Sequence, residues 1–324
     1  MARSQALSFR AADQELAGTL LLPDSAEAGT RVPWVVLLPS WLPRDRDGAW
    51  DRLGHPGWFA PAADTDRASP GLLARLAAAL AERGVASFRY DKRGCGASGG
   101  AWTSADLFTL IDDARDALGA LRGRPELDLR RSGLIGHGEG ATVAVSVAIS
   151  DPAIGALSLV GASARSLRDV LRRGVAERAR TGVDRDHPIV AALDRAGEEL
   201  IERAERREAS MGLRIGPQAV TLSLRGWEQA IHTPPLALAT MLHRSVALVH
   251  GSADAWADPD ESRLLADALP EPPVRVETVA GAGHDLAEAD EVRIGAVADD
   301  LASRLAPVEL PPVLLAIEGD GDTR

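Results

Sequence analysis

Apolar residues along the chain fall into short runs that alternate with longer segments of helical spacing. The run at 34–38 is apolar throughout, which is typical of a strand buried on both faces of a sheet. The segment 71–83 places leucine and alanine at helical spacing and stops before Gly84. This alternation predicts an α/β fold with a mostly parallel sheet flanked by helices. The expected strands span 16–22 (an early edge strand), 34–38, 85–90, 132–136, 154–160, 246–250 and 274–279, and the expected helices span 71–83, 104–122 (with Ser104 as N-cap), 139–149, 260–269 and 287–305.

The alternation stops between residues 164 and 243. This block has no clear strand and contains two long helical stretches rich in arginine and glutamate, at 167–180 and 189–211. An all-helical block between two sheet strands predicts a cap over the strand ends, with a separate helical domain as the alternative. The fold then consists of a core at 1–163 and 244–305, the cap at 164–243, and a proline-rich, finally acidic tail at 306–324 that we expect to be flexible.

Composition narrows the class of partner. Lysine and arginine number 36 against 47 aspartates and glutamates, a net charge of −11, which argues against binding to nucleic acid or to anionic lipid. The single cysteine, Cys95, excludes an internal disulfide framework and a cysteine-based zinc cluster. The first 14 residues contain no apolar signal-like segment, and no apolar run reaches membrane length. We therefore expect a cytoplasmic enzyme with a small-molecule substrate, for which a homodimer is an assembly that the sequence allows.

A strand, a sharp turn and a helix start follow one another at 132–141, which reads SGLIGHGEGA. Gly136 and Gly140 allow the helix start to pack closely against the strand end, which is the setting of the G-x-S-x-G nucleophile elbow. Here the sequence resembles the α/β-hydrolase superfamily, specifically its serine-aminopeptidase-like esterase branch, whose elbow usually reads G-H-S-E-G. In this chain the central residue is Gly138, so the hydroxyl that would attack a carbonyl is missing.

Other motifs carry the same resemblance. The stretch 90–100 (YDKRGCGASGG) is similar to the D-x-R-G-x-G-x-S-x-G of the family, and 43–48 (PRDRDG) is similar to its P-x-D-R-D-G. Asp254, in HGSAD, follows the strand expected at 246–250, and His284, in GAGH, follows the strand expected at 274–279. The order of elbow, acid and histidine is the order this fold uses. The resemblance implies that Asp254 orients His284, which then remains a competent general base.

The loop after the strand at 34–38 departs from the family pattern. The family tends to carry H-G-S-G, whereas this chain has Pro39-Ser40-Trp41-Leu42, whose bulk is expected to change the shape of the loop. The resemblance implies that the N–H groups of Trp41 and Glu139 form the oxyanion hole. The Glu139 side chain could act as an acid, or it could pair with an arginine and leave only its N–H in use.

Six of the seven tryptophans fall in segments that line the mouth of this fold. An aromatic-lined cleft suits a large flat or polycyclic ligand, although the same rings could simply pack the cap onto the sheet. His137 precedes the elbow glycine and is expected to pack more than to react, yet it stands close enough in sequence to count among the residues of the binding site. The candidate substrate-binding residues are Trp41, Leu42, Trp50, Trp58, Trp102, His137, Trp227 and Trp256.

Cofactor and metal chemistry find little support in the sequence. Residues 136–141 also satisfy the dinucleotide pattern G-x-G-x-x-A, but the next strand, 154–160, ends without an acidic residue to hold a ribose. The other histidines lack the spacing of metal ligands, and no sequence feature activates Cys95 as a replacement nucleophile. We expect neither a cofactor nor a metal.

Three functions remain open. The favoured hypothesis is a non-hydrolytic enzyme in which His284, oriented by Asp254, abstracts a proton while the oxyanion hole holds an enolate or alkoxide. Its reaction would be C–C bond formation, cyclisation or elimination (lyase chemistry) on a bulky, aromatic or polyketide-like carbonyl compound in natural-product biosynthesis. The second is a serine esterase or peptidase of which this chain is an inactive variant, with a natural or engineered glycine in place of the serine. A related version keeps hydrolysis and has His284 activate a water. The third is a ligand-binding protein without chemistry.

Overall fold

The computed structural model describes residues 2–28, 30–50, 71–183 and 186–314. In this part of the chain, eight strands form one sheet in the order β1-β2-β4-β3-β5-β6-β9-β10. The pairs β1–β2 and β2–β4 are antiparallel and all the others are parallel, so the predicted α/β class with a mostly parallel sheet is confirmed. The strands are β1 (Arg3–Ala11), β2 (Gln14–Leu22), β3 (Val32–Leu38), β4 (Ala86–Tyr90), β5 (Leu127–His137), β6 (Ile154–Val160), β9 (Ser245–Gly251) and β10 (Arg275–Val279).

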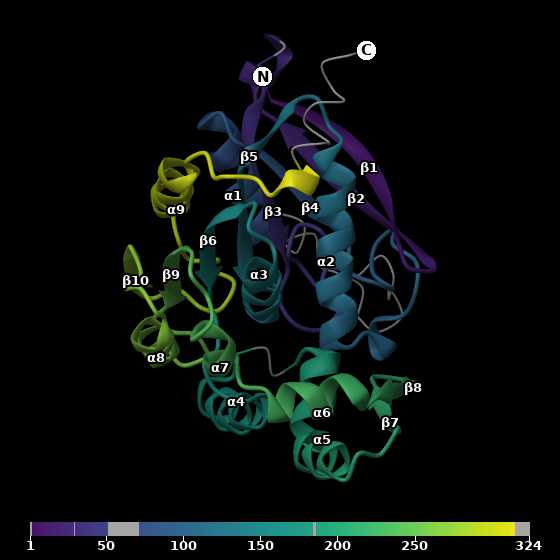
Figure 1. Cartoon of the computed structure of the whole chain (residues 1–324). Coiled ribbons are helices and arrows are strands. Elements are labelled where there is room, and N and C mark those ends of the chain that lie inside the picture. The colour runs from purple at the N-terminus through teal and green to yellow at the C-terminus, as the bar shows by residue number, and fades with distance from the viewer. Residues whose placement is uncertain (1, 29, 51–70, 184–185, 315–324) are drawn as a thin grey trace.

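Helices cover both faces of the sheet (Figure 1). On one face, α1 and α9 pack on the apolar side chains of the central strands, and on the other face α2 and α3 do so. The cause is visible in β3, whose seven residues are all buried, because a central parallel strand has neighbours above and below. The helices of the core are α1 (Leu72–Glu82), α2 (Leu107–Arg122), α3 (Glu139–Ser150), α8 (Asp260–Ala268) and α9 (Glu291–Arg304), with the short 3-10 helices η1 (Asp24–Ala28) and η4 (Trp102–Ser104).

Two details at the edges of the core differ from the sequence-based expectation. The strand expected at 16–22 is β2, and the edge position belongs to β1, whose side chains are mostly exposed and therefore give a weak apolar signal. The α2 helix begins at Leu107, and its N-cap is Asp106, whose carboxylate accepts the Thr109 N–H at 2.8 Å. Ser104 was the wrong cap, because it ends the preceding 3-10 helix.

The cap lies at the end of the sheet where the parallel strands terminate (Figure 1). It contains α4 (Leu167–Thr181), α5 (Pro188–Glu205), α6 (Arg225–His232) and α7 (Pro235–Ala239). The expectation of an all-helical block is wrong, because β7 (Ser210–Ile215) and β8 (Gln218–Ser223) form an antiparallel hairpin. Its cause is readable along β7, where buried and exposed residues alternate with a period of two, before a Gly216-Pro217 turn.

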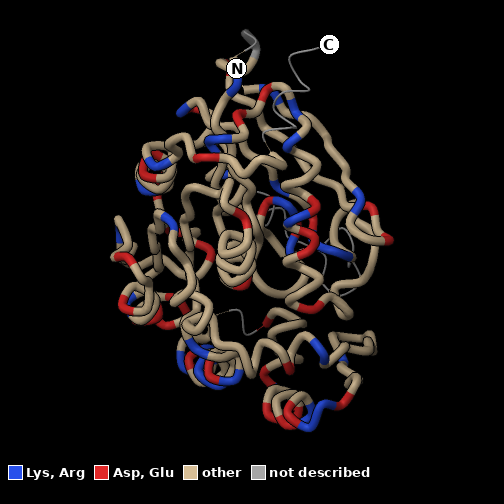
Figure 2. Tube along the Cα trace, viewed as in Figure 1, with Lys and Arg blue, Asp and Glu red and all other residues tan. Residues whose placement is uncertain are grey.

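Charges on the cap are paired. Figure 2 shows basic and acidic positions interleaved along α4 and α5, and the contacts agree: Arg172 lies 2.8 Å from Glu198 of the neighbouring helix, and Arg180 lies 2.6 Å from Glu177 one turn away. Such exposed pairs each contribute little to stability, but they neutralise the outer surface of the cap.

The chain after residue 305 does not fray at once. Leu310 and Leu314 are buried in a small cluster with Leu129 and Ala153, so the expectation of a flexible tail is wrong for 306–314. The remainder, 315–324, lies outside the described residues. In the described part of the chain, no helix is both long enough and apolar enough to cross a membrane.

Candidate active site

The turn between β5 and α3 has the geometry expected of an elbow. Gly138 has φ +53° and ψ −116°, in the left-handed half of conformational space that side chains rarely enter. A Cβ on Gly140 would lie 2.3 Å from the carbonyl oxygen of Leu38, so only glycine allows the helix start to sit this close to β3. The strand, turn and helix predicted from 132–141 are therefore all present, without the serine.

The acid and the histidine meet at the same end of the sheet. Asp254 follows β9 and His284 follows β10, and Nδ1 of His284 lies 2.8 Å from Oδ2 of Asp254. Two backbone N–H groups, of Trp256 and Ala257, donate to Oδ1 of Asp254 at 2.7 and 2.9 Å and fix its orientation. The structure thus brings together the pair that the sequence identified.

This pair sets its own protonation. Burial alone would raise the pKa of Asp254, but the charge of His284 and a hydrogen bond with His250 lower it well below its usual range. Burial would lower the pKa of His284, but the charge and hydrogen bond of Asp254 raise the pKa above its usual value of 6.5. The carboxylate therefore stays ionised and makes the imidazole a stronger base.

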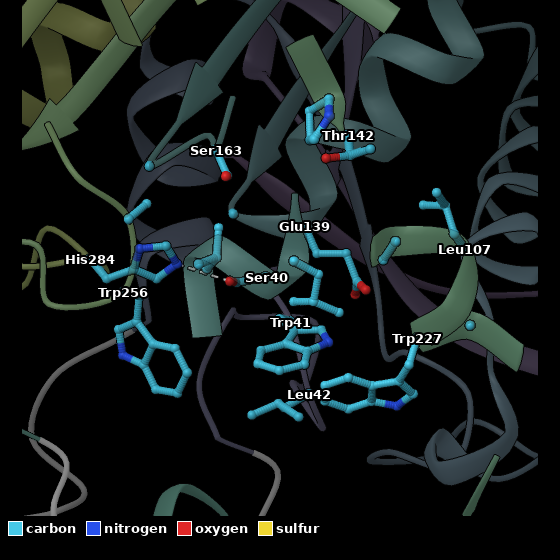
Figure 3. Close-up of a pocket in the computed structure, with 18 of the residues that line it drawn as sticks. Ser40, Trp41, Leu42, Leu107, Glu139, Thr142, Ser163, Trp227, Trp256 and His284 are labelled. Atoms are coloured by element: carbon cyan, nitrogen blue, oxygen red, sulfur yellow. Dashed lines mark hydrogen bonds between the residues drawn. The ribbon is translucent and has the colours of Figure 1, made fainter. Parts of the chain in front are cut away.

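The other nitrogen of His284 has a partner that the sequence analysis missed. Ser40 follows β3, and its Oγ lies 3.0 Å from Nε2 of His284, as the dashed line in Figure 3 marks. The hydroxyl, imidazole and carboxylate of Ser40, His284 and Asp254 form one hydrogen-bonded series. Ser40 is 2% exposed, and it lines the main pocket beside Gly138 and His284.

The space next to Gly138 is filled. A Cβ atom on Gly138 would lie 2.2 Å from Oγ of Ser40 and 2.9 Å from Nε2 of His284. The sequence leaves the nucleophile position at Gly138 without a hydroxyl, and in the structure the Ser40 side chain occupies the space beside it from the loop after β3. The sequence did contain a signal for Ser40, which is an exchange of residue types between two positions. This chain has serine at position 40, where the family pattern has a loop glycine, and glycine at position 138, where the family pattern has the elbow serine.

The loop that carries Ser40 keeps a glycine-like turn. Leu42 has φ +68°, a conformation that a leucine adopts only when its surroundings compensate, and its side chain is 4% exposed within the apolar cluster of the cap. The bulky loop residues thus alter the packing without removing the left-handed turn. The adjacent Glu139 side chain pairs with Lys92 at 2.8 Å, in place of the arginine considered from the sequence.

A pocket lined by Ser40 and His284 opens beside the series of Ser40, His284 and Asp254. Figure 3 shows aromatic side chains grouped on its lower side, where the rings of Trp41 and Trp227 meet edge to face at 4.8 Å. The predicted tryptophans that line it are Trp41, Trp50, Trp227 and Trp256, together with Leu42. These rings also pack on the cap cluster, so the binding and packing interpretations hold for the same residues.

The remaining candidates lie elsewhere. Trp102 lines a smaller cavity together with Trp41 and Trp227, and Trp58 lies outside the described residues. His137 does not reach the pocket: it is fully buried, and its Nε2 lies 3.0 Å from the backbone carbonyl oxygen of His284. Burial and the nearby charge of His284 lower the pKa of His137 to about 3, so it is neutral and supports the His284 loop. It was therefore wrongly placed among the residues that contact substrate.

Metal and thiol chemistry can be judged from geometry. His137, His284 and Asp285 bring ligand atoms within 4.8 Å of one another. Both ring nitrogens of His284 already have partners in Ser40 and Asp254, and Arg44 lies 3.3 Å from Asp285, so this cluster fits a hydrogen-bonded network better than a metal site. Cys95 is fully buried, with its thiol against the carbonyl oxygen of Arg93.

Comparisons with known proteins agree with this architecture. Residues 68–209 match the family model described as serine aminopeptidase, S33. A search of curated protein sequences finds no match to the chain.

Solved structures resemble the chain over nearly its whole length at low sequence identity. Est1E from Butyrivibrio proteoclasticus, with bound ferulic acid, is 14% identical with a TM-score of 0.64 and covers 93% of this chain and 99% of its own. DcsB in complex with its substrate analogue is 14% identical with a TM-score of 0.63 (94% and 100%). The α/β hydrolase GrgF from Penicillium sp. sh18 is 18% identical with a TM-score of 0.62 (93% and 98%). At these identities the likeness concerns the fold alone.

Proposed function

We propose that this chain, which has the fold of the α/β hydrolases, is an enzyme that cleaves an acyl compound through Ser40. The observation that carries the proposal is the hydrogen-bonded series in which Oγ of Ser40 lies 3.0 Å from Nε2 of His284 and Nδ1 of His284 lies 2.8 Å from Asp254. A hydroxyl, an imidazole and a carboxylate in this order form a nucleophile activated by an oriented base, whichever element carries the hydroxyl.

The reaction has two steps. In the first, Nε2 of His284 takes the proton of Ser40 as Oγ attacks the carbonyl carbon, and the imidazolium then gives that proton to the departing alkoxide or amine. In the second, His284 deprotonates a water that attacks the acyl carbon, the bond to Oγ breaks, and the proton returns to Ser40. Asp254 stays ionised throughout and stabilises the imidazolium, in keeping with its lowered pKa.

Two N–H groups serve the developing oxyanion in this scheme. Glu139 is the first residue of α3, where the N–H has no partner within the helix and the helix dipole favours negative charge. Trp41 follows Ser40 in the loop, and both residues line the pocket. A pair of such donors contributes several kcal/mol to catalysis in acyl-transfer enzymes, about 3–4 for one donor.

The pocket favours a bulky apolar acyl group. Trp41, Trp227 and Trp256 provide large faces beside His284, and such faces bind flat aromatic groups by burial and edge-to-face contact. Est1E, of the same fold, is described with bound ferulic acid, an aromatic acid. We therefore expect esters of aromatic acids to be better substrates than acetate esters.

The non-hydrolytic reaction inferred from the sequence is the second candidate. One observation favours it: Ser40 is 2% exposed, so its hydroxyl could relay a proton between substrate and His284 without attacking a carbonyl. The oxyanion donors would then hold an enolate during C–C bond formation, cyclisation or elimination on an aromatic or polyketide-like carbonyl compound. The difference between the two reactions is whether a covalent bond to Ser40 forms.

The test is an exchange of residues across the cleft. The wild type, Ser40→Ala, Gly138→Ser and the double variant Ser40→Gly/Gly138→Ser are treated with a fluorophosphonate and assayed on para-nitrophenyl esters of aromatic acids. We expect the wild type to be labelled at Ser40, Ser40→Ala to lose label and turnover, and the double variant to be labelled at position 138. Gly138→Ser alone is expected to be impaired, because its Cβ would lie 2.2 Å from Oγ of Ser40.

Other outcomes would redirect the assignment. An unlabelled wild type that exchanges the α-hydrogen of an aryl ketone for deuterium, and loses this exchange in His284→Ala, supports the non-hydrolytic candidate. Tight binding of aromatic acids with neither labelling nor exchange supports a ligand-binding protein.

A further inference from the structure

The only lysine of the chain is buried beside the proposed oxyanion hole. Lys92 follows β4 and is 7% exposed, and its ammonium donates to the backbone carbonyl oxygen of Ser40 at 3.1 Å and lies 2.8 Å from Oε2 of Glu139. Burying a charged ammonium is costly unless its partners compensate. One partner, Ser40, precedes the proposed donor Trp41, and the other, Glu139, carries the second proposed donor, so the position of Lys92 bears on the site and not only on stability.

The first contact fixes the direction of an N–H group. The carbonyl of Ser40 and the N–H of Trp41 belong to one planar trans peptide, in which they point in opposite directions. When Lys92 holds the carbonyl, the Trp41 N–H must point away from Lys92. Lys92 lines a smaller cavity and not the main pocket, whereas Ser40 and His284 line the main pocket, so an N–H that points away from Lys92 is placed to serve the main pocket.

The second contact ties the opposite wall to the first. Glu139 carries the other proposed donor in its own N–H. Through its contacts with Glu139 and with the Ser40 carbonyl oxygen, Lys92 joins the start of α3 to the loop after β3. The ammonium also polarises the Ser40–Trp41 peptide, which makes its N–H a stronger donor to a developing negative charge.

We infer that Lys92 is a positioning residue that holds the oxyanion hole in its formed state by clamping the Ser40–Trp41 peptide to Glu139. This inference rests on the proposed acyl transfer through Ser40. Without the clamp the peptide can rotate, turning the Ser40 carbonyl oxygen toward the place where the oxyanion develops.

Lys92→Met tests the clamp, because it keeps the length of the side chain and removes its charge and its donor. We expect kcat on a para-nitrophenyl aryl ester to fall about 10- to 100-fold with KM within about threefold, since an oxyanion donor acts mainly in the transition state. The inhibition constant of an aryl trifluoromethyl ketone should weaken by a similar factor. Lys92→Arg should recover part of the loss, Glu139→Gln should lose less than Lys92→Met, and Arg115→Met, which removes an exposed base, is the matched control.

A second measurement does not depend on turnover. Protein labelled with ¹⁵N-tryptophan gives one backbone amide signal for each of its seven tryptophans, and Trp41→Phe assigns the signal of Trp41. Lys92→Met should shift the Trp41 amide most. Unchanged kcat, inhibition constant and Trp41 signal in a folded Lys92→Met variant would overturn the clamp while leaving acylation of Ser40 intact. If instead the wild type is not acylated, the proposed function fails. The clamp is then judged by the Trp41 amide signal alone, and an unshifted signal in Lys92→Met rejects it.

Discussion

The turn at Gly138 and the loop at Ser40 both lie beside the imidazole of His284. In the usual elbow one residue carries both the sharp backbone turn and the hydroxyl, whereas here the turn and the hydroxyl stand on two different elements. The turn keeps the backbone geometry, with φ +53° at Gly138 and the N–H of Glu139 at the start of α3. The loop supplies the hydroxyl, with Oγ 3.0 Å from Nε2 of His284. If Ser40 is the nucleophile, as we propose, the position of a nucleophile relative to its base is maintained here while the element that carries it changes.

The largest effect should come from His284, whose imidazole lies beside both the Gly138 turn and the Ser40 loop. His284→Ala removes the base, and we expect kcat/KM on an aromatic ester to fall about 10³-fold or more, because neither wall can activate a hydroxyl alone. His243→Ala, at an exposed position, is the control. A His284→Ala variant with more than a tenth of wild-type activity would break the comparison, since the hydroxyl would then act without the imidazole.

The pH profile tests whether the pair behaves as the structure indicates. His284 must be neutral to accept a proton, and the charge of Asp254 raises its pKa above 6.5. Activity should therefore fall as the pH drops, with the midpoint of kcat/KM above 6.5. Asp254→Asn removes the charge that raises this pKa, so its midpoint should move to lower pH while the maximal rate falls about 10²- to 10⁴-fold. An unmoved midpoint would show that another group limits the rate.

The overlap between a side chain at position 138 and the hydroxyl of Ser40 can be measured through the free energy of unfolding. Gly138→Ala places a Cβ 2.2 Å from Oγ of Ser40 in a left-handed residue, and we expect unfolding free energy to fall by about 2 kcal/mol. Adding Ser40→Gly should restore about 1 kcal/mol by removing the overlap but not the strain.

The free energy of unfolding of Gly138→Ala, with and without Ser40→Gly, is measured by urea unfolding. Gly119→Ala is the control, because that glycine lies inside α2 with nothing within 4 Å of its added Cβ, and alanine should stabilise the helix by about 0.5–1 kcal/mol. Additive effects of Gly138→Ala and Ser40→Gly would show that the two walls do not compete for one space.

The smallest effect concerns the pocket. Trp227→Phe shortens the ring that meets Trp41 edge to face, and KM for esters of large aromatic acids should rise about three- to tenfold with kcat little changed. Acetate esters, which do not reach that ring, serve as the internal comparison. An equal rise in KM for both would mean that Trp227 supports the cap and does not contact the acyl group.

Much of the site followed from local sequence. The meeting of Asp254, His284 and the elbow turn can be predicted from the sequence because each stands directly after a strand, and strand ends of one parallel sheet meet at one edge; the catalytic roles of the two residues stay a prediction. The central strands were predicted for a similar reason, since a strand such as β3 is buried on both faces and leaves a continuous apolar run.

What was missed depends on contacts across the fold. From the sequence, Ser40 is one more departure in a loop. Its contact with His284 forms only in the folded chain, where its hydroxyl lies against the imidazole of a residue 244 positions away. The β7–β8 hairpin was missed because helical arginine and glutamate run up to it, because each strand has only six residues, and because buried and exposed residues alternate only along β7.

The overlap of 2.2 Å between a Cβ on Gly138 and the hydroxyl of Ser40 also has a historical consequence. With the Ser40 side chain in its present orientation, a serine at position 138 would overlap the loop hydroxyl, so the two positions do not hold both hydroxyls without a rearrangement. Among homologues we therefore expect the two positions to vary together, with serine at one and glycine at the other.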